Sequence, residues 1–323
     1  MRTPAFWYGA PGTSSALLAP AAGLYALGAR LKNQFAWAYR ADVPVICVGN
    51  LVAGGAGKTP VALALASLLK GRKLAFLSRG YGGSEAGPVQ VEAYRHRADE
   101  VGDEPLLLAR AATTWVSRNR ATGARAAAAA GAELIIMDDG FQNPSLEKDF
   151  SLIVVDGATG FGNGRLIPAG PLREPVGVGL ERADAVVIVG DDKTGIAANL
   201  RPGFPVLASR LTPTPDADFV AGKRVVAIAG IGRPEKFFAT LVEMGCTVAA
   251  HHAFADHHRY TTDEIMHICA EAAALDATPV TTEKDWVRLP QPTRAMVQTV
   301  PVTLEWQDEA QMRALLGRVL GQQ

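Results

Sequence analysis

Apolar and polar positions alternate along this chain in two kinds of block. Short apolar runs rich in β-branched residues predict strands, and longer segments in which apolar residues return every three or four positions predict helices. The predicted strands are 43–49, 73–78, 133–138, 151–156, 183–189, 205–210, 223–229, 246–250, 278–281 and 299–305. The predicted helices are 61–70, 103–112, 122–130, 235–244, 262–274 and 308–320. This alternation predicts an α/β fold with a mostly parallel sheet flanked by helices.

The length of 323 residues and one change in composition divide the chain. Such a length corresponds to about two domains. A stretch rich in threonine and proline at 211–215 separates the first group of strands from a second group that begins near Lys223. We therefore predict a larger α/β domain over 41–212 and a smaller α/β domain over 213–323. The final helix of the smaller domain is also compatible with packing back on the larger one.

Residues 1–40 form a third segment, which is basic and aromatic. It contains no acidic residue, four basic residues and seven aromatic residues. A helix that begins near Pro20, a residue suited to a first turn, places Leu24, Leu27, Leu31 and Phe35 on one face. An apolar face with basic flanks and aromatic residues is typical of a helix that lies in the plane of a membrane surface.

Two alternatives for this N-terminal segment stay open. The same helix is compatible with packing on the protein core, and composition alone does not decide between the two. The uncharged stretch between Arg2 and Arg30 is long enough to span a bilayer. Three prolines and four glycines interrupt that stretch, so spanning is the less favoured interpretation.

The segment 52–59, directly after the apolar run 43–48, has the pattern of a phosphate-binding loop (P-loop). Its glycines allow backbone N–H groups to point at an anion, and the following helix adds the positive end of its dipole. In this motif the lysine reaches the β- and γ-phosphates and the threonine hydroxyl binds Mg²⁺. The usual motif begins with a glycine, which is absent here. The predicted nucleotide-binding residues are Val52, Ala53, Gly54, Gly55, Ala56, Gly57, Lys58 and Thr59.

Two pairs of acidic residues are candidates for chemistry. Asp138 and Asp139 end a predicted strand, where carboxylates of a P-loop protein hold Mg²⁺. The alternative for this pair is an exposed acidic turn. Asp103 and Glu104 begin a predicted helix, followed by Pro105. Considered alone, this second pair favours a structural role, because acids and proline are common at helix N-termini.

Four of the six histidines cluster at 251–258. A transition-metal site, an acid–base group acting with a carboxylate, and a solvated loop are all compatible with this pattern. The loop 162–175 contains Arg165 and Arg173. Arginine suits phosphate recognition and can neutralise the charge that develops in phosphoryl transfer, although both are also compatible with surface charges.

The overall composition excludes some functions. The 32 basic and 32 acidic residues balance, which gives no indication of nucleic-acid binding. The three cysteines have neither metal-binding nor disulfide spacing and indicate a reducing compartment. The candidate chemistry therefore rests on the P-loop, the acids, the histidines and the arginines.

Together these motifs resemble those of the tetraacyldisaccharide 4′-kinase family of the lipid A pathway. They occur in order through essentially the whole chain, and a P-loop without the leading glycine is itself the form found in that family. The motifs are VAGGAGKTP at 52–60, SRGY at 78–81, GDEP at 102–105, DDGFQ at 138–142, GRLIPAGPLRE at 164–174, DHH at 256–258 and TEKD at 282–285.

The resemblance implies a reaction and a role for each matching residue. ATP, with Mg²⁺, would phosphorylate the 4′-hydroxyl of a tetraacylated glucosamine disaccharide 1-phosphate. Asp103 would accept the proton of that hydroxyl and His257 would orient Asp103. The implied catalytic set is Asp103, His257, Lys58 and Arg173, and the implied metal set is Thr59, Asp138, Asp139 and Glu104.

The resemblance also implies where the protein acts. Its lipid substrate resides in a bilayer, so we expect a peripheral or monotopic protein at the cytoplasmic face of the inner membrane, with no nucleic acid and no obligate protein partner. The N-terminal helix would then contact the membrane surface. The alternatives are a soluble P-loop kinase for small molecules, a partitioning-type ATPase, and a non-enzymatic, nucleotide-dependent membrane scaffold.

Overall fold

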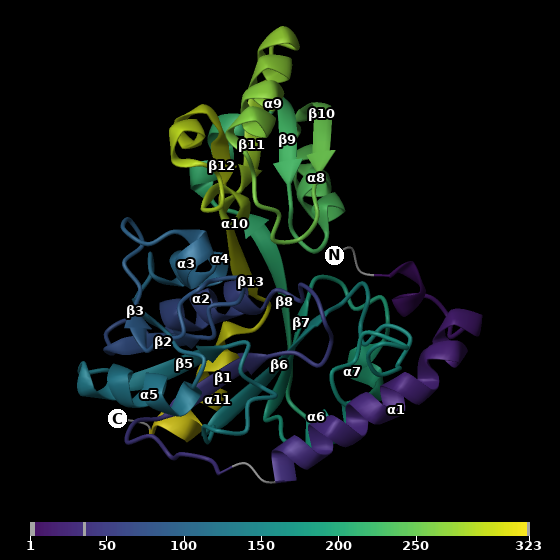
Figure 1. Ribbon diagram of the computed structural model, residues 1–323, viewed down its shortest axis with the longest axis vertical. Helices are drawn as coiled ribbons and strands as arrows, with labels where there is room; N and C mark the ends of the chain where they lie inside the picture. The colour runs from purple at the N-terminus through teal and green to yellow at the C-terminus, as the bar shows by residue number, and fades with distance from the viewer. Residues whose placement is uncertain (1–3, 35–36, 322–323) are drawn as a thin grey trace.

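Two sheets organise the chain. The computed structural model describes residues 4–34 and 37–321, without the side chains of 29–34. In Figure 1 the smaller, four-stranded sheet stands above the larger, nine-stranded one. The larger sheet contains, in spatial order, β13 (Val302–Trp306), β8 (Val206–Pro213), β7 (Ala185–Val189), β6 (Phe150–Asp156), β1 (Val45–Gly49), β5 (Leu134–Asp138), β2 (Leu74–Ser78), β4 (Thr113–Val116) and β3 (Val89–Gln90).

The larger sheet is mostly parallel, as the alternating pattern predicts. Only its two edge pairs, β13 with β8 and β3 with β4, are antiparallel. The central strand β1 lies between β5 and β6, with Val48 level with Asp138 and Gly49 level with Ile153. Because the strands are parallel, their carboxyl ends and the loops that follow them meet at one edge of the sheet.

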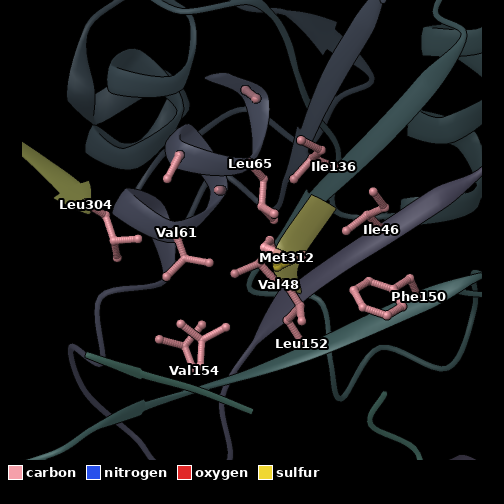
Figure 2. Packing of buried hydrophobic residues seen from close by; sticks show 14 of the residues in the cluster. Ile46, Val48, Val61, Leu65, Ile136, Phe150, Leu152, Val154, Leu304 and Met312 are labelled. Carbon is pink, nitrogen blue, oxygen red and sulfur yellow. The ribbon is translucent and has the colours of Figure 1, made fainter. Parts of the chain in front are cut away.

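Helices cover both faces of the larger sheet. On one face α2 (Lys58–Leu68) and α11 (Glu309–Leu320) enclose a core in which Leu65 and Met312 meet Val48 and Ile136 (Figure 2). Burial of such aliphatic side chains stabilises the fold by about 1.5–3 kcal/mol each. The opposite core includes residues of α5 (Arg120–Ala129) and α7 (Ile196–Asn199), with α6 (Val176–Glu181) packed against it.

The smaller sheet is entirely parallel and carries helices on its two faces. Its strands, in spatial order, are β10 (Thr247–Ala253), β9 (Arg224–Ala229), β11 (Thr278–Thr282) and β12 (Gln298–Val300). Phe237 and Leu241 of α8 (Pro234–Glu243) are buried on one face, and Ile265 and Ile268 of α9 (Thr262–Ala274) are buried on the other. Two short helices, α3 (Ala98–Val101) and α4 (Asp103–Leu108), pack against each other beside the larger sheet, and α4 contacts α10 (Glu283–Trp286) of the smaller one (Figure 1).

The predicted strand 299–305 is wrong, because the chain leaves one sheet and enters the other at Pro301. Residues 298–300 form the edge of the smaller sheet, and 302–306 pair with β8 in the larger sheet. A proline has no N–H for a sheet hydrogen bond, so it suits such a crossing. The smaller sheet therefore lies within 224–300, and β13 and α11 return to the larger sheet. The domain limits drawn at 212/213 stay a prediction.

The N-terminal helix begins earlier than predicted. After a short 3₁₀ turn, η1 (Ala5–Trp7), α1 runs over Thr13–Gln34 and contains Pro20 within it. Proline removes one helical hydrogen bond, but contacts of the first turns hold the helix, since the Ser15 hydroxyl donates to the carbonyl of Ala169 at 2.9 Å. Phe35 lies outside the described residues. Within the described part of the chain, every helix is too short or too polar to cross a membrane.

Candidate active site

The P-loop lies between β1 and the N-terminus of α2. Gly54 and Gly57 have φ angles of 116° and 89°, which glycine adopts readily and other residues avoid. Lys58 and Thr59 form the first turn of α2, and both are buried. The amino end of this helix therefore opens onto the loop, in the arrangement that binds phosphate groups.

Val52 stands where the usual motif has a glycine, and its contacts in the structure explain the valine. It forms an antiparallel bridge with Leu172, and the next residue, Ala53, donates its N–H to the carbonyl of Pro171 at 2.8 Å. The valine side chain is buried in the core below. A β-branched residue suits this bridge, whereas glycine would leave the core position empty. The bridge also ties loop 162–175 to the P-loop.

Asp138 and Thr59 have the arrangement of a divalent-cation site. The Thr59 hydroxyl donates to Asp138 Oδ2 at 3.0 Å. The other oxygen, Oδ1, is buried without a hydrogen-bond partner among the described residues. Burial, reinforced by the negative charge of Glu104, raises the pKa of Asp138 to about 7. A buried, unpartnered carboxylate oxygen beside a hydroxyl fits Mg²⁺, which prefers such oxygen ligands.

Asp139 lies close to two predicted cationic residues, Arg173 and Lys58. Its carboxylate lies 2.9 Å from Arg173 Nη1 and 3.8 Å from Lys58 Nζ. Although burial opposes it, the charges of Lys58 and Arg173 lower the pKa of Asp139. Its φ angle of 50° is unusual for a residue other than glycine. Such strain is common at functional sites, where surrounding contacts hold it in place.

The second acid pair meets the histidine cluster across the two sheets. Asp103, at the start of α4 on the larger sheet, places Oδ2 2.9 Å from Nδ1 of His257, which follows β10 of the smaller sheet. The other oxygen of Asp103 accepts the N–H of Glu104 at 2.9 Å. Asp103 is the first residue of α4, whose N-cap is Gly102, so its side chain does not cap the helix. Its carboxylate contacts its immediate neighbour and, in addition, a partner that is distant in sequence.

Cations dominate the surroundings of Asp103. Burial alone would raise its pKa, but the hydrogen bond from His257 and the charges of Lys284 and Arg288 outweigh burial and lower the pKa to about 2. Asp103 is therefore ionised at neutral pH. Lys284 also lies 3.0 Å from Glu104, and the charges of Glu104, Asp103 and Asp256 raise the pKa of Lys284 against the effect of burial.

His257 is held in an unusual conformation. Its φ angle is 58°, and its ring packs against Tyr81 of the loop after β2, with the ring centres 5.2 Å apart. Nε2 of His257 lies 3.8 Å from Asp256. The ligand atoms of Asp103, Glu104 and His257 lie within 4.8 Å of one another, but the two carboxylates already face Lys284 and Arg288. We therefore interpret this group as a charge network for acid–base work.

The other histidines of the cluster are engaged elsewhere. His252 pairs with Glu271 at 2.7 Å, and His258 pairs with Glu264 at 3.2 Å. His251 packs against Phe238 of α8. His257 therefore contacts Asp103 of the larger sheet, whereas His251, His252 and His258 contact residues of the smaller sheet and its helices.

The two sheets also meet beside the P-loop. Asp156, at the end of β6, accepts bonds from Arg233 at 2.9 Å and from Lys236 at 2.5 Å. A Cβ atom on Gly55 of the P-loop would lie 4.0 Å from Gly232 in the turn before α8. We call Asp156, Arg233 and Lys236 the Asp156 clamp. It joins the sheets through residues other than Asp103 and His257.

Sequence reasoning missed several members of the site. The buried Arg120, whose charge acts on Asp139, follows β4, a strand that the sequence pattern did not predict. Lys284 and Arg288 lie on one turn after β11, spaced i and i+4. Charged residues directly after a buried strand were the available signal for this pair. Gln142 adds a hydrogen bond from Arg173 at 3.3 Å.

Comparison with known proteins gives one consistent result. Residues 14–321 match the model of a family described as tetraacyldisaccharide-1-P 4′-kinase. The chain is 54% identical to tetraacyldisaccharide 4′-kinase of Rhodospirillum centenum, over 99% of this chain and 97% of that protein. It is 52% identical to the protein of the same name from Rhodospirillum rubrum, over 99% of this chain and 98% of that one.

A solved structure agrees with the fold. The crystal structure of the "apo" form of LpxK from Aquifex aeolicus in complex with ATP has a TM-score of 0.78 with this chain at 28% sequence identity. The alignment covers 95% of this chain and 100% of that one. The two sheets and their helices are thus shared over nearly the whole length.

Proposed function

This chain belongs to the tetraacyldisaccharide-1-P 4′-kinase family, and from that premise we propose how its residues perform the reaction. It is a kinase that phosphorylates the 4′-hydroxyl of a tetraacylated glucosamine disaccharide 1-phosphate, a step of lipid A biosynthesis. A soluble small-molecule kinase or a partitioning-type ATPase is not favoured, because the relatives match along the whole chain. The observation that carries the mechanism is the contact of Asp103 with His257 beside the P-loop.

The donor half of the site is the P-loop with the acids after β5. The loop N–H groups and the amino end of α2 would hold the phosphates of ATP. Lys58 would leave Asp139, 3.8 Å away, to contact the β- and γ-phosphates, and Arg173 would neutralise charge that develops on the transferred group. Positioning and charge neutralisation are the main requirements of phosphoryl transfer.

Magnesium would complete the donor half. The Thr59 hydroxyl and the unpartnered oxygen of Asp138 are the groups best placed to bind it, with Asp139 and Glu104 adding negative charge nearby. Bound by these residues, Mg²⁺ would supply positive charge that offsets the negative charge of the ATP phosphates. Its position beside Thr59 follows from the ordinary geometry of P-loop sites.

The acceptor half is Asp103 with His257. The low pKa of Asp103 keeps it ionised at neutral pH, so that it can accept the proton of the sugar hydroxyl as the bond to phosphorus forms. His257 Nδ1, 2.9 Å away, would fix the orientation of the carboxylate and stabilise its charge. General-base help of this kind contributes about 10²–10⁴-fold.

One assay tests this function. Purified protein is incubated with γ-labelled ATP, Mg²⁺ and a 1-phosphorylated tetraacyl disaccharide in mixed micelles. We expect label in the lipid at the 4′ position and its loss in the variant Asp103→Asn. ATP hydrolysis without labelled lipid would contradict the proposal and favour a nucleotide switch, whereas nucleotide binding without any turnover would favour a scaffold.

We further propose that α1 lies in the membrane surface and brings the site to its lipid substrate. The support is the orientation of the helix. Its small residues Ser15 and Ala22 are buried against the protein, while Leu17, Leu24 and Leu27 are 76%, 73% and 55% exposed. A helix packed on the core would bury its leucines, so an exposed leucine face indicates an apolar environment outside the protein.

An exposed tryptophan follows α1 in the chain. Trp37 is 94% exposed, and tryptophan favours the boundary between lipid and water. We propose, on this basis, a peripheral or monotopic protein at the cytoplasmic face of the inner membrane, where ATP is available.

Vesicle binding tests the membrane proposal. Replacing Leu17, Leu24 and Leu27 by glutamine should lower partition onto phosphatidylglycerol–phosphatidylethanolamine vesicles by about tenfold or more, since each leucine contributes about 1.5–3 kcal/mol when buried. The matched control replaces three exposed apolar residues of the smaller domain, Val242, Met266 and Met296, by glutamine. Equal binding of both triple variants would refute the role of α1.

A further inference from the structure

A buried arginine reaches Asp103 from the smaller sheet. Arg288 follows α10, and its side chain is only 5% exposed. Its Nε lies 3.4 Å from Asp103 Oδ2, the same oxygen that faces His257. The guanidinium therefore contacts the carboxylate proposed to accept the sugar proton, although it belongs to the other sheet.

Several fixed groups hold this guanidinium in place. Nη2 donates to Asp285 Oδ1 at 2.6 Å and to the carbonyl of Gly230 at 2.8 Å, and Nη1 donates to the carbonyl of His258 at 3.3 Å. These carbonyls belong to the turn after β9 and to the loop that carries His257. One rigid, planar group thus links both loops to Asp103, which a lysine could not do because its charge is concentrated at one point.

Asp285 is itself built into the interior. It is fully buried, and its carboxylate accepts the hydroxyls of Tyr260 and Thr282, each at 2.6 Å, and the N–H of Gly230 at 2.9 Å. A Cβ atom at Gly230 would lie 2.7 Å from the Tyr260 hydroxyl, so the turn approaches this carboxylate closely. The anchor of Arg288 is therefore satisfied by several bonds and leaves little freedom for the guanidinium to move.

We propose that Arg288 is a positioning residue for phosphoryl transfer: anchored by Asp285, it fixes Asp103 and the His257 loop in one arrangement across the two sheets. This inference rests on the proposed kinase reaction and concerns the acceptor half alone. Arg288 has no contact with the P-loop residues 52–59 among the described contacts. Its loss should therefore slow transfer without weakening ATP binding.

The test compares Arg288→Gln with a matched arginine in the same segment. Arg294 also donates to buried carbonyls, those of Leu289 and Val287, at 3.0 and 2.8 Å, but does not contact Asp103. We expect Arg288→Gln to lower kcat about 10²-fold with the ATP Kd changed less than about threefold, because misplacing a reacting group by about 1 Å costs this much. Arg294→Gln should stay within about threefold of the wild type in kcat.

Two further experiments keep the test decisive if Arg288→Gln folds poorly. The pair Asp285→Asn/Arg288→Gln removes both buried charges and should fold while remaining about 10²-fold slow. Added guanidinium should restore kcat of Arg288→Ala about tenfold or more, with no effect on Arg294→Ala, since only a site-filling cation can replace the missing group.

The outcomes separate this inference from the proposed function. Failure of the wild-type protein to phosphorylate the disaccharide would overturn the kinase reaction itself. An active wild type in which Arg288→Gln and Arg294→Gln are equally fast would overturn the positioning role. Equal losses in kcat and in ATP affinity for Arg288→Gln would do the same, because they would indicate a general disturbance of both halves.

Discussion

The donor and acceptor halves of the site are built in different ways. The donor half comes from one sheet, in which the P-loop follows β1 and Asp138 ends the neighbouring β5, level with Val48. The acceptor half joins two sheets, and its members Asp103 and His257 are 154 residues apart in sequence. The donor half therefore needs only its own sheet to be intact, whereas the acceptor half exists only while the two sheets are held together.

This difference indicates how the reaction is controlled. The P-loop and the acids after β5 belong to one sheet, but the proposed proton acceptor Asp103 has its partner His257 only where the two sheets meet. Charged contacts join the two sheets in two places: Glu104 with Lys284 beside Asp103 with Arg288, and the Asp156 clamp. We expect a catalytic group assembled from two sheets in this way to limit wasteful hydrolysis of ATP in the absence of the sugar.

The largest effect should come from removing Asp103, the proposed proton acceptor. Asp103→Asn preserves shape but cannot take the proton, so we expect kcat to fall about 10³-fold. The ATP Kd, measured by calorimetry, should change less than about threefold, because the donor half is untouched. Equal losses in both quantities would show that the two halves are not separable.

Removing the Lys58 ammonium group from the donor half should weaken ATP binding and slow phosphoryl transfer. Lys58→Ala takes away the charge that would contact the phosphates, and we expect kcat to fall about 10²-fold together with weaker ATP binding. Lys70→Ala, an exposed lysine just beyond the other end of the same helix, is the control and should behave as the wild type. Unchanged ATP affinity in Lys58→Ala would contradict the assignment of the P-loop.

The pH dependence of magnesium binding should follow Asp138. Because its pKa is raised to about 7, the metal-free carboxyl holds a proton below that pH, and Mg²⁺ must displace it. The apparent Mg²⁺ affinity should therefore fall about tenfold per pH unit below pH 7 and level off above it. Titrations of Mg²⁺ at pH values from 5.5 to 8.5 would measure this affinity. An affinity that does not change with pH would contradict the assignment of Asp138 to the metal site.

The smallest effect should come from the Asp156 clamp, which joins the sheets away from the proton acceptor. Its cations Arg233 and Lys236 are 36% and 38% exposed, so they remain solvated when Asp156 is lost. We expect Asp156→Asn to lower kcat less than about fivefold and stability by about 1 kcal/mol or less. A loss as large as that of Asp103→Asn would mean that the two sheets are held together chiefly by this clamp.

Sequence predicted the donor half because its signals are local. Strand, glycines, Lys58 and Thr59 follow one another directly, and Asp138 ends a predicted strand, so elementary rules for parallel sheets bring them together. The predicted strands of the larger sheet are recovered to within a few residues for the same reason. β4 was missed because 113–116 is short and partly polar, TTWV, and lacks a clear apolar run.

The acceptor half could not be predicted from local pattern. Asp103 looks like an ordinary acid at a helix start, and it does lie in the first turn of α4, although Gly102 is the N-cap and the Asp103 side chain does not cap the helix. Its pairing with His257 came only from the resemblance to a known family. For Arg288 the sequence offered only a charged residue shortly after a predicted strand, because its contact with Asp103 depends on how the two sheets pack. The sequence did not predict the crossing at Pro301 for a related reason, since hydrophobic alternation does not say which sheet a strand joins.

A double-mutant cycle between Asp103 and His257 tests the account most directly. If the two residues act as one unit across the sheets, Asp103→Asn/His257→Ala should lose little more kcat than Asp103→Asn alone, while ATP binding stays intact. Losses that multiply, so that the double variant is about 10²-fold slower than Asp103→Asn, would show independent roles and contradict a proton acceptor assembled from both sheets.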